Sequence, residues 1–267
     1  MPSILHGGGE PLPCSFGRPT YSQGDYNLHC NSYPFYKQRP MFTLLFLSGG
    51  TGSRMLNAVP KQYMLLAGKP VVMHILERVD QLPEIAEVVM VCAKEYEPAI
   101  ALMLNQYGVR TPVRFAPAGS TRQESVRNGL AMVATDNVIV HEAARPFVKV
   151  EDFQRLMEAN EPNAMLGEAI PFSVLVGHEY VEGALERSSL VNVQLPQKFQ
   201  TQLLREVHEK AMADGATFTE DAAMLHKYHP EVPIKICPGM PYNLKLTTRI
   251  DMLVGEQIYD EVFRKRK

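Results

Sequence analysis

Cysteine is scarce in this sequence, and long apolar or singly charged runs are missing. The four cysteines of the 267-residue chain form no CxxC pair and no cluster with zinc-site spacing; they are Cys14, Cys30, Cys92 and Cys237. This usage favours a reducing compartment, which we take to be the cytoplasm. No apolar run reaches the length of a membrane span, and no signal-peptide pattern opens the chain.

Charge is nearly balanced, with a formal net charge of -2. Bulk electrostatics therefore suggest no nucleic-acid partner, while a local cationic pocket stays compatible with this balance. We interpret the short basic end at residues 264–267 as a solvated terminus. Hydrophobic residues make up 45% of the chain, which is enough for a large core without disulfide or metal cross-links.

The first 40 residues differ from the rest of the chain. They are rich in Gly, Pro, Ser and Tyr and show neither helical nor strand periodicity. One interpretation is a disordered tail. The other is that translation starts at Met41, where a well-patterned strand begins. We favour the second, because nothing before Met41 fits a targeting class.

From Met41 onward, strand-like and helix-like patterns alternate. We expect strands over residues 42–47, 88–92, 113–116, 138–140, 164–171 and 232–237. We expect helices over residues 70–79, 126–133, 150–159, 201–213, 219–228 and 248–263. The alternation predicts a doubly wound, mostly parallel α/β sheet, in which ligands bind beyond the carboxyl ends of the strands. Residues 172–194 interrupt it, and their short alternating pattern predicts a protruding β-hairpin arm.

The first candidate site follows the strand at 42–47. It reads SGGTGSRM at residues 48–55 and continues as PKQY at residues 60–63. Glycines allow backbone N–H groups to converge on an anion. The dinucleotide fingerprint needs a glycine where Met55 stands, and the P-loop needs Gly-Lys-Ser/Thr, so neither applies. Arg54 and Lys61 beside such a loop suit a triphosphate whose leaving group gains charge. The alternative is a tight turn with surface cations.

The second motif, GSTRQES at residues 119–125, follows the strand at 113–116. Its small polar groups are suited to reading the edge of a base. An equally good interpretation of this motif by itself is a helix N-cap with a solvent-facing arginine at Arg122.

The third motif, HEAARP at residues 141–146, lies at a strand end. The carboxylate of Glu142 is a ligand type that Mg²⁺ prefers where it bridges phosphates. Arg145 can hold an incoming phosphate in bidentate fashion. We interpret His141 as a packed strand-end histidine. A fourth motif, NLKLTT at residues 243–248, adds the cation of Lys245. Taken by itself, this lysine is expected to be solvated.

Together the motifs resemble the cytidylyltransferases that act on methylerythritol 4-phosphate and ribitol 5-phosphate. They occur in the family's order over about residues 42–260, as GGxGSRM, PKQY, TRQESV, HxAARPF, LPQKF and NLKLTT. The resemblance implies a Rossmann-like fold in one nucleotidyltransferase domain at residues 41–263. It also implies CTP and a polyol phosphate as substrates, Mg²⁺ as cofactor, and a homodimer in which the arms clasp the partner. The product would be a CDP-polyol, for isoprenoid or cell-surface polysaccharide synthesis.

The resemblance also implies roles for individual residues. Arg54 and Lys61 would stabilise the triphosphate and the transition state, and Glu142 would correspond to the metal carboxylate. The nucleotide would contact Ser48, Gly49, Gly50, Gly52, Gly119, Ser120, Arg122 and Ser125. The acceptor phosphate would be held by Arg145, by Lys245 and by Arg187 of the partner's arm, with Leu175 facing the acceptor.

Three departures from the family pattern concern the acceptor and the metal. Glu142 replaces an aspartate, Val174-Leu175 replaces Asp-Thr, and the arm before Arg187 is shorter than usual. A missing hydroxyl at Leu175 predicts that methylerythritol 4-phosphate is a poor substrate or binds in an altered pose. Two alternatives stay open: the same chemistry on another sugar, and a catalytically silent nucleotide-binding protein of the same fold.

Overall fold

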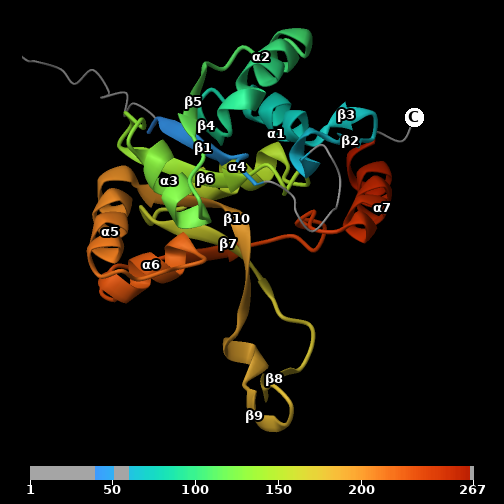
Figure 1. Ribbon diagram of the computed structural model, residues 1–267. Coiled ribbons are helices and arrows are strands. Elements are labelled where there is room, and N and C mark those ends of the chain that lie inside the picture. Colours follow the sequence, from blue (N-terminus) through green and yellow to red (C-terminus); the bar gives the residue numbers. More distant parts are fainter. Residues whose placement is uncertain (1–39, 51–59, 265–267) are drawn as a thin grey trace, which may run out of the picture. The chain divides into compact units, whose positions relative to one another are not determined.

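The computed structural model describes residues 40–50 and 60–264. A seven-stranded sheet lies at its centre, with the order β11-β7-β10-β6-β1-β4-β5 (Figure 1). The strands are β1 (Phe42–Leu47), β4 (Ile85–Cys92), β5 (Val113–Pro117), β6 (Asn137–Glu142), β7 (Ala164–Ala169), β10 (Val191–Gln200) and β11 (Lys235–Pro238). Only β10 among them runs antiparallel to its neighbours, β6 and β7. The predicted mostly parallel α/β sheet is therefore confirmed.

Helices cover both faces of this sheet. One face carries α1 (Val71–Val79), α2 (Glu97–Gln106) and α4 (Val150–Met157), and the other carries α3 (Arg122–Leu130), α5 (Thr201–Ala213) and α6 (Asp221–Tyr228). Strand β1 faces both layers, because Leu44 and Phe46 pack on the first and Leu45 and Leu47 on the second. A strand buried on both faces requires a nearly continuous apolar run, which the sequence shows at residues 44–47.

The chain changes direction across the sheet next to β1. It passes from β1 to β4 and β5, and α3 then returns it to β6 on the other side of β1. The carboxyl ends of β1 and β6 thus form a topological switch point, where doubly wound sheets bind ligands. Ser48 follows β1 directly and Glu142 ends β6. Both residues are therefore placed at this point by the strand order.

The predicted arm is present as a two-stranded hairpin. It consists of β8 (Val174–Gly177) and β9 (Val181–Leu185), and it extends away from the sheet and its helices (Figure 1). Gly177 has a φ of +147°, and a Cβ there would lie 2.1 Å from the Tyr180 carbonyl oxygen, so the turn requires glycine. The predicted arm reached residue 194, but the chain joins β10 of the main sheet at Val191.

The C-terminal segment packs along α1, where Tyr259 contacts His74 and Phe263 contacts Arg78. Helix α7 (Arg249–Ile258) starts at a Thr248 capping box with Asp251 and continues into a π-helical turn, Tyr259–Phe263. It covers the small hairpin of β2 (Leu65–Leu66) and β3 (Lys69–Pro70), where Leu66, Val71, Phe147 and Leu246 form a separate buried cluster. Within the described residues, no helix is both long and apolar enough to cross a bilayer.

Candidate active site

A cleft of about 450 Å³ lies at the switch point, between the loops that follow β1, β5 and β6. It brings together ten of the residues predicted from the sequence: Ser48, Gly49, Gly50, Lys61, Gly119, Ser120, Arg122, Ser125, Glu142 and Lys245. The predictions for Gly52 and Arg54 lie outside the described residues, as do those for residues 1–39. The strand-end motifs therefore converge, although up to about 200 residues separate them in the chain.

The loop after β1 is held closely against its surroundings. The Ser48 amide donates to the Val91 carbonyl at 2.8 Å, which extends the pairing of β1 with β4. A Cβ at Gly49 would lie 2.6 Å from the Cβ of Ala118, so the close approach of two loops excludes any side chain there. The buried Gln62 amide donates to the carbonyls of Ser48 at 2.7 Å and Gly50 at 2.9 Å.

The loop after β5 combines the two interpretations of its motif. Thr121 caps α3, because its hydroxyl accepts from the Glu124 amide at 3.0 Å. Glu124 in turn accepts from the amide and hydroxyl of Ser120, and the Ser125 hydroxyl accepts from the Gly119 amide at 3.0 Å. The predicted helix N-cap is therefore confirmed, and the same turn, residues 119–122, lines the cleft. The predicted alternative of a solvent-facing Arg122 is wrong, because this side chain is largely buried and ion-paired.

Glu142 lies between two cations at the end of β6. Its carboxylate is 3.1 Å from Nε of Arg122 and 2.6 Å from Nζ of Lys245. Burial alone would raise the pKa of Glu142, but the charges of Lys245 and Arg122 outweigh it and hold this pKa below its usual value. The carboxylate is therefore ionised at neutral pH. The sequence pattern alone predicts a solvated Lys245, but the ion pair with Glu142 holds this side chain at the site.

Behind Arg122 lies a buried acidic group that the sequence analysis missed. Nη2 of Arg122 is 2.7 Å from Oδ2 of Asp221, and Oδ1 of Asp221 is 3.1 Å from Nε2 of His208. Asp221 and His208 are each only 1% exposed. In the sequence, Glu220 and Asp221 look like the acidic first turn that any helix favours, so the pattern carries no sign of a buried counter-ion.

Arg145 is the one predicted acceptor residue of the strand-end loops that does not line the cleft. Its guanidinium donates to the Asn243 carbonyl at 2.9 Å and to the Val193 carbonyl at 3.4 Å, so it joins the loop after β6 to β10 and the 243–248 segment. Its own carbonyl is 3.0 Å from Nε2 of His141. Burial lowers the pKa of His141 to about 3, and the neutral ring packs against Phe46, as expected of a structural histidine.

Leu175 and Arg187 lie on and beside the hairpin, away from the cleft lining of their own chain. Leu175 is 58% exposed, and Arg187 donates to the Pro171 carbonyl at 3.2 Å. Their predicted contact with the acceptor was placed in a partner subunit, and it stays a prediction.

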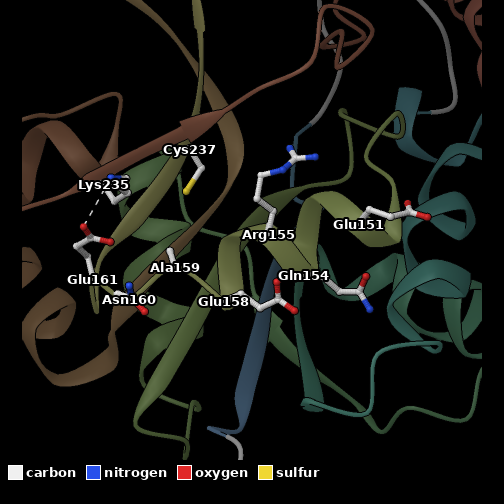
Figure 2. Close-up of a pocket in the computed structure, with 9 residues that line it drawn as sticks. All are labelled: Glu151, Gln154, Arg155, Glu158, Ala159, Asn160, Glu161, Lys235 and Cys237. Carbon is white, nitrogen blue, oxygen red and sulfur yellow. Dashed lines mark ion pairs between the residues drawn. The ribbon is translucent and has the colours of Figure 1, made fainter.

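A second, more open cleft of about 570 Å³ lies between α4 and β11 (Figure 2). Its lining carries the acidic residues Glu151, Glu158 and Glu161 against Arg155 and Lys235. Arg155 and Lys235 are already engaged, with the Pro238 carbonyl and Glu161 respectively. This acidic balance is unsuited to a triphosphate, and no glycine stands among the described residues that line this second cleft, so the strand-end cleft is the candidate active site.

Comparison with known proteins identifies the family of this chain. The family profile described as IspD, 2-C-methyl-D-erythritol 4-phosphate cytidylyltransferase, matches residues 42–261. The chain belongs to this family. It is 33% identical over 231 residues to the chloroplastic enzyme of that name from Oryza sativa, covering 84% of this chain and 76% of the relative. It is 34% identical over 224 residues to the enzyme from Geobacillus thermodenitrificans, covering 81% and 96%.

Solved structures of this family share the fold. The 4-diphosphocytidyl-2C-methyl-D-erythritol synthase of Anaerococcus prevotii superposes with a TM-score of 0.74 at 24% identity, covering 83% of this chain and 96% of the other. The cytidylyltransferase of Thermus thermophilus gives 0.67 at 25% identity, covering 81% and 98%. This chain is a CTP-dependent cytidylyltransferase that forms a CDP-polyol and pyrophosphate. Family membership favours this activity over the silent alternative, and the family is generally metal-dependent.

Proposed function

We propose that this cytidylyltransferase uses 2-C-methyl-D-erythritol 4-phosphate as its acceptor and acts in the cytoplasm. The observation that carries the proposal is the convergence of Lys61, Glu142 and Lys245 with two glycine loops in one strand-end cleft. The relatives named above support the acceptor. CTP would lie with its triphosphate at the loop after β1 and Lys61, and with its cytosine at Gly119, Ser120 and Ser125.

The chemistry needs no nucleophile from the protein. An oxygen of the acceptor phosphate attacks the α-phosphorus of CTP, a new P–O bond forms, and the bond to pyrophosphate breaks. A phosphate is already charged, so the protein contributes positioning and electrostatic stabilisation. Lys61, and Arg54 by resemblance, would offset the negative charge that grows on the leaving pyrophosphate. Lys245 would direct the acceptor phosphate.

Glu142 would hold Mg²⁺, which neutralises phosphate charge when bound. The fit rests on the donor set, because Mg²⁺ with a nucleotide typically takes one or two carboxylates and completes its shell with phosphate oxygens and water. Glu142 is ionised and reaches the cleft. Within the described part of the chain no group of three acidic, histidine or cysteine side chains offers an all-protein cage. A single carboxylate therefore suits an ion that arrives with the triphosphate.

The acceptor assignment predicts a measurable role for Leu175. An apolar side chain leaves a polar substrate group without a partner, so Leu175→Thr should raise kcat/KM for methylerythritol 4-phosphate by about tenfold. Pyrophosphate release from CTP is measured with this acceptor and with ribitol 5-phosphate, and Val181→Thr on the same hairpin is the control. Preference for ribitol 5-phosphate would refute the proposed acceptor. A kcat/KM unchanged in Leu175→Thr would refute the role of Leu175.

We place the active site in a homodimer, with Arg187 reaching across. The hairpin supports this, because Leu175, Tyr180 and Val181 are exposed apolar side chains on a segment that extends from the sheet. A Lys61→Ala chain mixed with an Arg187→Ala chain should then recover about a quarter of wild-type activity. After random exchange half of the dimers are mixed, and each has one site with both residues. No recovery after demonstrated subunit exchange would show that Arg187 serves its own chain.

A further inference from the structure

Gln62 contacts the glycine loop after β1 but has no direct part in the proposed reaction. Its side chain is 3% exposed, and its amide nitrogen donates to two backbone carbonyls of the glycine loop, those of Ser48 and Gly50. A side-chain amide group carries two N–H donors, and here both donate to carbonyls of the same loop. The distances of 2.7 and 2.9 Å lie within the normal range for such bonds.

Holding these carbonyls also orients the amides of the loop. In a trans peptide the C=O and the following N–H point in opposite directions. The Ser48 carbonyl points toward Gln62, which itself lines the cleft, so the Gly49 N–H of the same peptide unit points away from Gln62. Gly49 and Gly50 line the cleft, and a converging set of such N–H groups is what an anion needs.

The same side chain joins the loop to the residue that carries Lys61. Lys61 and Gln62 share one 3₁₀ turn, closed by the Tyr63 amide donating to the Pro60 carbonyl at 2.9 Å. The Tyr63 hydroxyl is 3.3 Å from the Ser48 hydroxyl, which adds a second contact between turn and loop. Gln62 therefore fixes the position of the backbone amides of the loop relative to the Lys61 cation.

We propose that Gln62 is a positioning residue for the triphosphate of CTP, which sets the direction of the Gly49 amide and its register with Lys61. An apolar side chain of equal volume would fill the space but leave two carbonyls without donors and free to turn into the cleft. The proposal rests on the proposed placement of the triphosphate. Wild-type CTP binding, measured in parallel, tests that placement separately.

Gln62→Leu tests the contact directly. Loss of two buried hydrogen bonds should weaken CTP binding about tenfold or more and lower kcat by a similar factor, since both depend on the oriented loop. CTP affinity is measured by calorimetry and turnover by pyrophosphate release. Gln81→Leu is the matched control, because Gln81 donates to the Glu77 carbonyl on the exposed end of α1. Wild-type affinity and turnover in a folded Gln62→Leu protein would overturn the proposal.

Gln62→Glu gives a readout that a purely structural role would not produce. Protonated, the new carboxyl donates one hydrogen bond to the loop; ionised, it repels both carbonyls. Burial beside two carbonyl oxygens raises its pKa, so the protonated form persists at mildly acidic pH. The titratable groups next to position 62 are Lys61, Tyr63, Cys92, Glu95 and Tyr96, and the cleft that Gln62 lines also carries Arg122, Glu142 and Lys245. Burial raises the pKa of Tyr63 and of Cys92 to about 12, so neither titrates near neutrality.

The expected result is a pH-dependent ratio of dissociation constants. The CTP Kd of Gln62→Glu divided by that of wild type should be about 3 at pH 5.5 and at least tenfold larger at pH 8.5. Taking the ratio removes the titration of CTP itself. Gln81→Glu should give a flat ratio near 1. A flat ratio for Gln62→Glu as well would overturn the positioning role. Failure of the wild type to bind CTP would refute the proposed site instead.

Discussion

Replacing Lys61 by alanine should lower kcat by roughly 10²-fold or more, while the affinity for CTP changes far less. Lys61 lines the cleft beside residues 48–50, where the leaving pyrophosphate would lie. The charge on pyrophosphate grows as the bond to the α-phosphorus breaks, so a cation there stabilises the transition state more than bound CTP. Arg54→Ala should behave in the same way on the family pattern, although Arg54 lies outside the described residues.

The measurement separates kcat from CTP binding for each variant. Lys227→Ala, an exposed lysine on α6, serves as the control and should keep wild-type kinetics. Lys61→Arg keeps the charge but changes its shape and should recover part of the loss. If Lys61→Ala and Arg54→Ala both turned over normally at saturating CTP, the assignment of this loop to the triphosphate would be wrong.

Replacing Asp221 by asparagine should lower the free energy of unfolding at pH 7 by about 3 kcal/mol, the lower end for breaking a buried ion pair. The lower end applies because the Arg122 side chain keeps 21% exposure and a second partner in Glu142. The substitution preserves shape but removes the charge that faces both Arg122 and His208. Urea unfolding measures the change. Glu231→Gln, which removes an exposed partner of His229, should leave the unfolding free energy nearly unchanged.

The same carboxylate gives this effect a pH dependence. Burial would raise the pKa of Asp221, but Arg122 and His208 outweigh it and lower this pKa from 3.8 to about 2. Because the folded value lies below the unfolded one, the stabilisation is complete above about pH 4 and is lost as pH falls toward 2. The difference in unfolding free energy between wild type and Asp221→Asn should therefore decrease by about 2 kcal/mol over that pH range. If this difference in unfolding free energy stayed constant down to pH 2, the charge of Asp221 would not be responsible for the stabilisation.

The parallel framework was predictable because its signals are local. A strand buried on both faces needs a nearly continuous apolar run, and Phe42–Leu47 is one, with Thr43 as its single polar residue. Helix α5 occupies Thr201–Ala213 as predicted, and Gly215 beyond it has a φ of +62° that favours glycine after a helix. The strand-end motifs then converge because parallel strands place their carboxyl ends at one edge.

Helix α2 and strand β10 are two of the elements that the sequence pattern did not predict, and the reason is clear for each. Helix α2 (Glu97–Gln106) buries only Ile100 and leaves Leu102 68% exposed, so it lacks a clear apolar stripe. Strand β10 is central yet contains buried polar residues, whose partners lie far along the chain. Lys198, for example, donates to the Ala159 carbonyl at 2.8 Å. A buried polar side chain is stable only where it has a hydrogen-bond partner, and no local sequence pattern shows that partner.

The sequence alone predicted which loops line the strand-end cleft, because glycine spacing, cations and a strand-end carboxylate are visible directly along the chain. Only the tertiary structure decided how the charges pair. It placed Glu142 between Arg122 and Lys245, set Asp221 behind Arg122, and turned Arg145 toward the Asn243 carbonyl. These partners lie about 20 to 100 residues apart in sequence. Charge pairing inside a protein depends on distance and burial, and both exist only once the sheet has brought its strand ends together.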